Sequence, residues 1–119
     1  MLDDHYNIKG MTSQHTGVWL NDIEKIASIG IQVRHRYTSH GFAINVSNEP
    51  LDWFKHIVAC GIQGAQMTSI SKALNKDINV EDSTIPCVNA FSKVFNAQLE
   101  ELTGDDQIDE LLQSTVYKQ

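Results

Sequence analysis

Two alternating runs of apolar and polar residues stand out in the first half of the chain. The segment 25–37 alternates from Ile29 to Arg34, and a second alternation runs over 42–46. A period of two residues is typical of half-buried strands. The segment 38–41 between the runs has the small and polar residues of a turn, so we expect an antiparallel hairpin or a bend there. Residues 48–50, Asn-Glu-Pro, are expected to close the second strand.

The segments before this hairpin carry shorter signals. Residues 2–8 indicate the end of a helix that runs into Gly10. The aromatic and β-branched segment 17–20 predicts a short strand, and Asn21-Asp22 predicts a turn directly after it.

Apolar residues return at helical spacing in the second half of the chain. The segment 68–74 predicts a short helix, and 80–99 predicts an amphipathic one, in which Pro86 must lie near the first turn or kink the helix. Gly104 is expected to end it, and 105–119 to form an acidic last helix or tail. Strands come first and helices follow, which predicts the α+β class. The apolar stripe of the long helix comprises Val88, Phe91, Phe95 and Leu99.

The chain is long enough for one domain with its own core. It has 119 residues, of which 41% are hydrophobic and 20% are charged, and this excludes wholesale disorder. Its apolar runs are far shorter than the ~20 residues of a membrane span. Two cysteines without a visible signal peptide argue against a secreted disulfide scaffold. We therefore expect a single domain over 1–119 that is soluble, intracellular and not associated with a membrane.

Charge is distributed unevenly along the chain. The net charge is −6, and residues 100–119 hold six acids against one base, Lys118. Nucleic acid is not expected as a partner, because no basic stripe is long enough to release many counterions. The one cationic cluster is Lys25 with Arg34 and Arg36. Strand spacing places both arginines on one face, which is either a docking face for an acidic protein or the solvent side of the sheet.

Cys60 is the first candidate for chemistry. It follows the apolar run 57–59 and enters a turn that contains Gly61 and Gly64. A cysteine there can be partly exposed, with backbone N–H groups nearby that stabilise an oxyanion. The alternative is a small buried hydrophobe, since free cysteine is usually structural. That alternative is stronger for Cys87, which lies beside the apolar face of a helix.

Lys25 is the second candidate, because it opens a strand of mostly apolar or small residues. A lysine at a strand edge is normally solvated. A functional lysine would be partly buried beside the thiol that it activates, since a nearby ammonium favours the thiolate. The five histidines match no zinc spacing, so no metal site is expected. His40, before Gly41 at the start of a strand, is a candidate substrate-shaping group, with an ordinary turn residue as the alternative.

Four blocks of the sequence resemble the lipoyl(octanoyl) transferases, a family that shares its fold with biotin and lipoate protein ligases. Gly17-Val-Trp-Leu20 fits the segment that precedes the first block. The blocks occur in the family's order and close to its spacing, and the match covers roughly residues 1–100. They are Lys25-Ile-Ala-Ser-Ile-Gly30, Thr38-Ser-His-Gly-Phe-Ala-Ile-Asn-Val46, Trp53-Phe-Lys-His-Ile-Val-Ala-Cys-Gly-Ile62 and Thr68-Ser69.

The resemblance implies an enzyme that moves an octanoyl group from octanoyl-acyl carrier protein to a lysine of lipoyl domains. The implied acceptors are the lipoyl domains of 2-oxoacid dehydrogenases and the glycine cleavage H protein. Cys60 is the implied nucleophile, which forms an acyl thioester, and Lys25 is the implied residue that lowers the pKa of this cysteine and assists proton transfer. The implied substrate contacts are Ser28, Ile29, Gly30, Gly41, Phe42 and Ala43. No cofactor and no ATP are expected, in agreement with the lack of a phosphate-binding glycine-rich loop.

Two departures from the family pattern matter. Ala59 stands where many bacterial members have proline, and this block looks more like the mitochondrial branch, so we expect a mitochondrial protein, or a cytoplasmic one if the source is bacterial. The Arg-Gly-Gly and Tyr-His-Gly-Pro-Gly segments that wall the family's acyl pocket are absent, and no transit peptide is visible. We therefore expect the C-terminal part of a biotin/lipoate protein ligase-like catalytic domain, with a mixed sheet and helices packed on it. The alternatives are a fragment without catalysis, a ligase-like binding module, and a cysteine thioesterase, which would lack the acceptor step.

Overall fold

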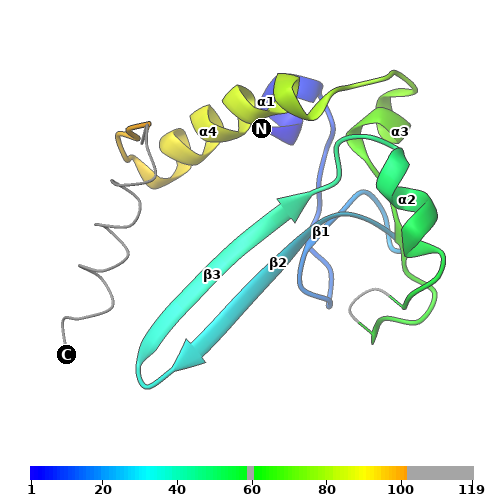
Figure 1. Ribbon diagram of the computed structural model, residues 1–119, viewed down its shortest axis with the longest axis horizontal. Helices are drawn as coiled ribbons and strands as arrows, with labels where there is room; N and C mark the ends of the chain where they lie inside the picture. Colours follow the sequence, from blue (N-terminus) through cyan, green and yellow to red (C-terminus); the bar gives the residue numbers. More distant parts are fainter. Residues whose placement is uncertain (59–60, 102–119) are drawn as a thin grey trace.

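The computed structural model describes residues 1–58 and 61–101 as strands and helices in an α+β arrangement, which confirms the expected fold class (Figure 1). Its strands pair in both directions, so the sheet is mixed, as expected. The elements are α1 (Leu2–Tyr6), β1 (Val18–Trp19), β2 (Glu24–Arg34), β3 (Tyr37–Ile44), α2 (Glu49–Phe54), β4 (Gln66–Met67), α3 (Ile70–Leu74) and α4 (Val80–Phe95).

A long antiparallel hairpin of β2 and β3 dominates the sheet (Figure 1). The hairpin was expected, but its turn was placed wrongly at 38–41, because these residues belong to β3. The chain instead turns at His35 and Arg36, whose φ angles of 48° and 71° are both left-handed. A two-residue loop of this kind matches the right-handed twist of the strands, and it lets 38–41 add four further pairs to the ladder. Arg36 therefore lies in the turn, and the expectation that it shares a strand face with Arg34 is wrong.

The start of β2 is paired on both of its edges. Lys25 pairs with Trp19 of β1 on one edge, so its parallel partner, Met67 of β4, must lie on the other edge. From Ala27 onward that second edge is occupied by β3. The strand β4 has only two residues, which is too short to show a period in the sequence, and it was not predicted.

The helices differ from expectation at their ends. Residues 48–50 were expected to close a strand, but they begin α2, where Pro50 occupies the first turn and its missing N–H costs nothing. The long helix α4 ends at Phe95 instead of residue 99, because Asn96 adopts a left-handed φ of 48°. Pro86 lies inside α4, beyond its first turn. The expected end at Gly104 and the expected last helix or tail at 105–119 lie outside the described residues.

The core lies where the start of β2 and the end of β3 meet the helices. A hydroxyl contact of 2.7 Å between Tyr6 Oη and Ser83 Oγ ties α1 to α4. Among the described residues no helix is both long and apolar enough to cross a membrane. The core side chains are Ile8, Ile26, Ala27, Val46 and Ile70.

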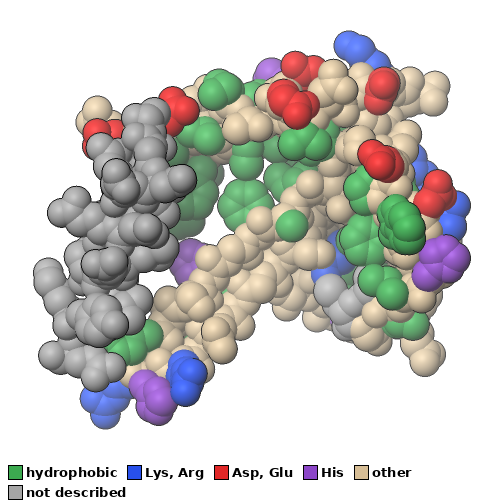
Figure 2. All heavy atoms as spheres, viewed as in Figure 1, with side chains coloured by type: hydrophobic (Ala, Val, Ile, Leu, Met, Phe, Trp, Pro, Cys, Tyr) green, Lys and Arg blue, Asp and Glu red, His purple; other side chains and the backbone are tan. Residues whose placement is uncertain are grey.

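Beyond this core, one face of the hairpin remains apolar and exposed. The side chains of Ile31 and Val33 are each 68% exposed. Nearer the core, Ile29 and Phe42 line an open cavity of about 430 Å³ together with Phe91 and Phe95 of α4. Figure 2 shows hydrophobic side chains gathered along the helical layer above this space. The amphipathic stripe expected for the long helix thus faces the hairpin without closing on it.

Candidate active site

Lys25 is the second residue of β2, and its side chain is buried. It is only 2% exposed, which excludes the solvated strand-edge lysine that the sequence left open as an alternative. Its Nζ lies 5.6 Å from the centroid of the Trp19 ring, within reach of a cation–π interaction. Trp19 is itself buried, and its indole N–H donates to the carbonyl of His15 at 3.1 Å. A rigid aromatic wall therefore covers the ammonium group.

Gly17 supplies the space for this lysine. It has a φ of 138°, which side-chain-bearing residues rarely adopt. A methyl group built on it would lie 3.1 Å from Lys25 Nζ and 2.7 Å from the Ala27 carbonyl oxygen. The Lys25 side chain thus packs directly over the backbone of the segment before β1.

A β-bulge determines the face of the sheet to which Lys25 points. Val18 pairs with Ala27, whereas the next residue, Trp19, pairs with Lys25, so β2 carries one extra residue here. Val18 and Trp19 are neighbours in one strand and point to opposite faces. Lys25 therefore lies on the face opposite to Ala27, and this is the face of Ser28 and Gly30.

Small residues on both hairpin strands form a strip on this same face. Ser28 pairs with Ala43, and Gly30 pairs with Gly41. A Cβ added at either glycine would meet nothing within 4 Å. The strip therefore exposes backbone, against which an extended chain can lie closely. Ile29 and Phe42, the other two expected substrate contacts, pair with each other and point to the opposite, apolar face.

His40 is not brought to the small-residue strip. It was expected at the start of a strand, but it lies within β3 opposite Ile31, on the apolar face. It lines the cavity between the hairpin and α4 instead. The expected cluster of Lys25 with the two arginines is also wrong, because Arg34 and Arg36 lie at the hairpin tip and Lys25 at the opposite end of β2.

Cys60, the expected nucleophile, lies outside the described residues. The chain after it returns through Gly61 and Gly64, which have φ angles of 69° and 83°, and then enters β4 beside Lys25. Residues 62–65 line an open cavity of about 580 Å³ together with Trp19 and Ile23. Cys87 lies half-buried on α4 and lines a different, apolar cavity with Phe42 and Val80, in keeping with the structural alternative.

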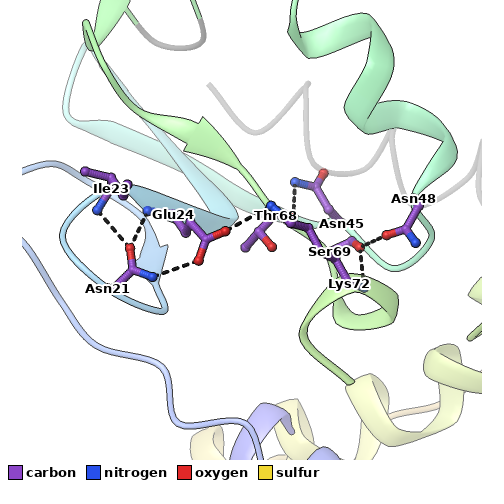
Figure 3. A network of polar contacts seen from close by, with 8 residues as sticks. All are labelled: Asn21, Ile23, Glu24, Asn45, Asn48, Thr68, Ser69 and Lys72. Carbon is purple, nitrogen blue, oxygen red and sulfur yellow. Dashed lines mark hydrogen bonds and ion pairs between the residues drawn. The ribbon is translucent and has the colours of Figure 1, made fainter. Parts of the chain in front are cut away.

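A polar network anchors the start of β2 to the segment that follows β4 (Figure 3). Lys72 of α3 donates to Glu24 at 2.9 Å. This hydrogen bond, with a second one from Asn21, holds the pKa of the Glu24 carboxyl below its ordinary value of 4.5. The Asn21 side-chain oxygen also accepts from the N–H groups of Ile23 and Glu24, which forms the turn expected at Asn21-Asp22. Within residues 1–58 and 61–101, no group of three His, Cys, Asp or Glu side chains is arranged to hold a metal ion.

Sequence reasoning did not single out three residues that shape the surroundings of Lys25. Trp19 and Gly17 were noted only as part of a short strand, and Asn45 only as a polar residue in an alternating run. A glycine directly before an aromatic strand is the signal that could have pointed to a close backbone approach at Gly17. No local pattern marks Asn45, because its partners lie far away in the sequence.

Comparison with known proteins places these residues in a family. A model of the lipoyl protein ligase A/B catalytic domain matches residues 1–92. The chain is 44% identical over 85 residues to the mitochondrial octanoyl-acyl-carrier-protein:protein N-octanoyltransferase of Homo sapiens, a match that covers 71% of the chain and 36% of the relative. It is 42% identical over 89 residues to the putative mitochondrial lipoyltransferase 2 of Drosophila melanogaster, with 75% and 37% covered.

A bacterial relative shows a similar relationship. The octanoyltransferase of Caldicellulosiruptor saccharolyticus is 37% identical over 108 residues, a match that covers 89% of the chain and 45% of that protein. The chain thus spans less than half the length of these relatives. The matched region includes Lys25, the small-residue strip and the segment around β4. The chain belongs to the lipoyl protein ligase A/B catalytic domain family.

Proposed function

We propose that this chain takes part in octanoyl transfer from an acyl carrier protein to a lysine of lipoyl domains, with Cys60 as nucleophile. The observation that carries the proposal is the burial of Lys25 on the same face as the small-residue strip. The human and the bacterial relative that share this region are named octanoyltransferases, and the name of the human one gives an acyl carrier protein and a protein as its substrates.

The chemistry consists of two acyl transfers. The Cys60 thiolate attacks the thioester carbonyl of the donor, a new S–C bond forms, and the carrier's thiolate leaves and takes up a proton. The acceptor's lysine amine then attacks the cysteine thioester, an amide forms, and the cysteine thiol is released. The first transfer is nearly balanced, because one thioester replaces another, and amide formation drives the second. Neither step requires ATP or a cofactor.

Lys25 acts in this scheme as a fixed positive charge and a proton carrier. A neighbouring ammonium stabilises the thiolate and the oxyanion that develops on the carbonyl oxygen. Burial strengthens this effect, because the surrounding medium screens the charge less than water does.

The small-residue strip is the proposed path of the acyl chain. Ser28, Gly30, Gly41 and Ala43 leave the hairpin backbone open on this face, so an eight-carbon chain can lie against it without displacing side chains. We propose Ile29 and Phe42 as residues that set the strip's position from the opposite face. His40, on that same opposite face, keeps only an indirect substrate-shaping role.

The acceptors in this proposal are the lipoyl domains of 2-oxoacid dehydrogenases and the glycine cleavage H protein. The proposed location is the mitochondrion, as for the human and fly relatives, whose names include it, or the cytoplasm if the source is bacterial.

A second candidate function is that of a ligase-like binding module or a fragment without catalysis. The exposed apolar face at Ile31 and Val33 favours it, because an exposed apolar patch is typical of a surface that binds another chain.

Incubation with octanoyl-acyl carrier protein tests the proposal. Intact mass should increase by one octanoyl group, and Cys60→Ser should abolish the adduct. Cys87→Ser is the matched control and should leave the adduct unchanged. An adduct on Cys87, or none on the wild-type chain, would overturn the assignment in favour of the second candidate. Release of free octanoate without a lipoyl domain would indicate a thioesterase instead.

A further inference from the structure

We propose that Asn45 is a positioning residue for Lys25, an inference that rests on the function proposed for that lysine. Asn45 directly follows β3. It lies at the point where the strand that pairs with one edge of β2 changes from β3 to β4. Figure 3 shows its side chain directed at the segment that begins with Thr68. No other described side chain donates a hydrogen bond to that segment's backbone at this junction.

Three hydrogen bonds attach Asn45 to two segments, β2 and the stretch that leads from β4 into α3. Its N–H donates to the Ile26 carbonyl at 3.1 Å, and its carbonyl accepts from the Ile70 N–H at 3.0 Å. Its side-chain Nδ2 donates to the Thr68 carbonyl at 3.0 Å. Asn45 thereby fixes the distance between β2 and the chain that leads from β4 into α3.

The contact with Thr68 continues to Lys25. The Thr68 N–H donates to the Lys25 carbonyl at 2.9 Å, so one residue is held by Asn45 on its carbonyl side and holds Lys25 on its N–H side. Thr68 is 1% exposed, and no water can replace a lost partner at such a site without rearrangement. Loss of the Asn45 amide would therefore move Thr68, and with it the backbone from which the Lys25 side chain extends.

Asn48 provides a matched control, because its side chain contacts Ser69, the residue next to Thr68. Its side-chain oxygen accepts from the Ser69 hydroxyl at 2.6 Å, and the same hydroxyl caps α3 by accepting from the Lys72 N–H at 3.0 Å. Asn48 thus also holds this segment through a side-chain amide, and its hydrogen bond leads through Ser69 to the first turn of α3 (Figure 3). The hydrogen bond of Asn45 leads instead through Thr68 to the Lys25 carbonyl. A comparison of substitutions at the two asparagines therefore distinguishes a general loss of stability from a specific displacement of the Lys25 side chain.

The test compares Asn45→Ala with Asn48→Ala in the complete chain by NMR. The ε-methylene protons of Lys25, assigned with Lys25→Arg, should be shifted upfield by the Trp19 ring in the wild type. We expect Asn45→Ala to move them toward the position of an exposed lysine, and Asn48→Ala to leave them in place at a comparable unfolding midpoint. Equal shifts in both variants, or none in Asn45→Ala, would overturn the proposal.

Two further measurements keep the test decisive. If Asn45→Ala does not fold, Asn45→Gln, which displaces the amide by one methylene, should give the same change with smaller size, and Asn48→Gln should not. In the octanoyl adduct assay, Asn45→Ala should slow formation about tenfold or more without weakening donor binding. A wild-type chain that forms no adduct would refute the proposed function, while the Lys25 spectrum would still decide the role of Asn45.

Discussion

Gly17 and Lys25 lie so close together that position 17 has no room for a side chain. A methyl group there would come within 3.1 Å of Lys25 Nζ, and nearer still to Cε. The left-handed φ of 138° imposes the same restriction from the backbone. The buried ammonium, its cover by Trp19 and the glycine beneath it therefore form one packed unit, in which a change at one residue must affect the others.

Gly17→Ala should destabilise the fold and displace Lys25. The added methyl meets both the lysine side chain and the Ala27 carbonyl oxygen, and the backbone angle adds strain. We expect a loss of about 1–3 kcal/mol in the free energy of unfolding. Urea denaturation measures it. An unchanged unfolding midpoint would mean that the chain relaxes around position 17 and that the contact with Lys25 is not fixed.

Gly30→Val and Gly41→Val should leave the fold stable but impair octanoyl transfer. A Cβ at either position meets nothing within 4 Å, and both residues lie in strands, where β-branched side chains are favoured. We expect stability to remain the same or to rise by up to about 1 kcal/mol. Octanoyl adduct formation should nevertheless fall, because the new side chains obstruct the small-residue strip.

The comparison of rates with stability decides this second prediction. Thr38→Val, farther along β3 and on the other face, is a matched strand substitution that should leave adduct formation unchanged. Adduct formation at the wild-type rate in both glycine variants would show that the acyl chain does not use this strip.

Much of the fold could be predicted from the sequence where periodicity was long. The alternation around Ile31 and the spacing of Phe91 and Phe95 identified the hairpin and the long helix, because each pattern repeats over several turns or pairs. The hairpin turn could not be placed, because His35 and Arg36 lack the composition of a left-handed loop while 38–41 have it. Pairing of 38–41 with β2 outweighed that local preference.

The candidate site was predictable only in part, for a different reason. Motif resemblance identified Lys25 and the glycines of the strip as candidates, but it did not indicate which face of the sheet each occupies. The face that Lys25 occupies depends on the bulge opposite Val18 and Trp19, a feature of strand register that has no sequence signature. Asn45 escaped notice because its side chain acts on Thr68, 23 residues later.

Ile31→Lys should reduce self-association of the chain. Ile31 is 68% exposed on an apolar face, and β2 has no partner beyond β1 on that edge within the described residues. Such an edge is a template for pairing with another chain. Sedimentation velocity should show larger species in the wild type and fewer in the variant. Gln32→Lys, one residue away on the other face, is the control and should reduce association less.

The ion pair between Glu24 and Lys72 should contribute to stability near neutral pH and lose its effect in acid. The pKa of Glu24 is lowered in the folded chain, mainly by the hydrogen bond from Lys72. A carboxyl of this kind stabilises the fold above its unfolded pKa, near 4.5, and the contribution disappears as the pH falls through the lower folded value. Since the Lys72 side chain is 47% exposed, we expect less than about 1 kcal/mol.

Thermal unfolding of Lys72→Met against the wild type measures this contribution. The difference in midpoint should be largest near pH 7, shrink as the pH falls below 4.5, and decrease with added salt. Lys55→Met is the control, because its pair with Asp52 lies within one helical turn and both side chains are more than two-thirds exposed. It should lower the midpoint less at every pH, since it joins no separate elements, whereas Lys72 joins α3 to the strand that carries Lys25. A pH-independent difference for Lys72→Met would mean that the ion pair with Glu24 is not the source of the stabilisation.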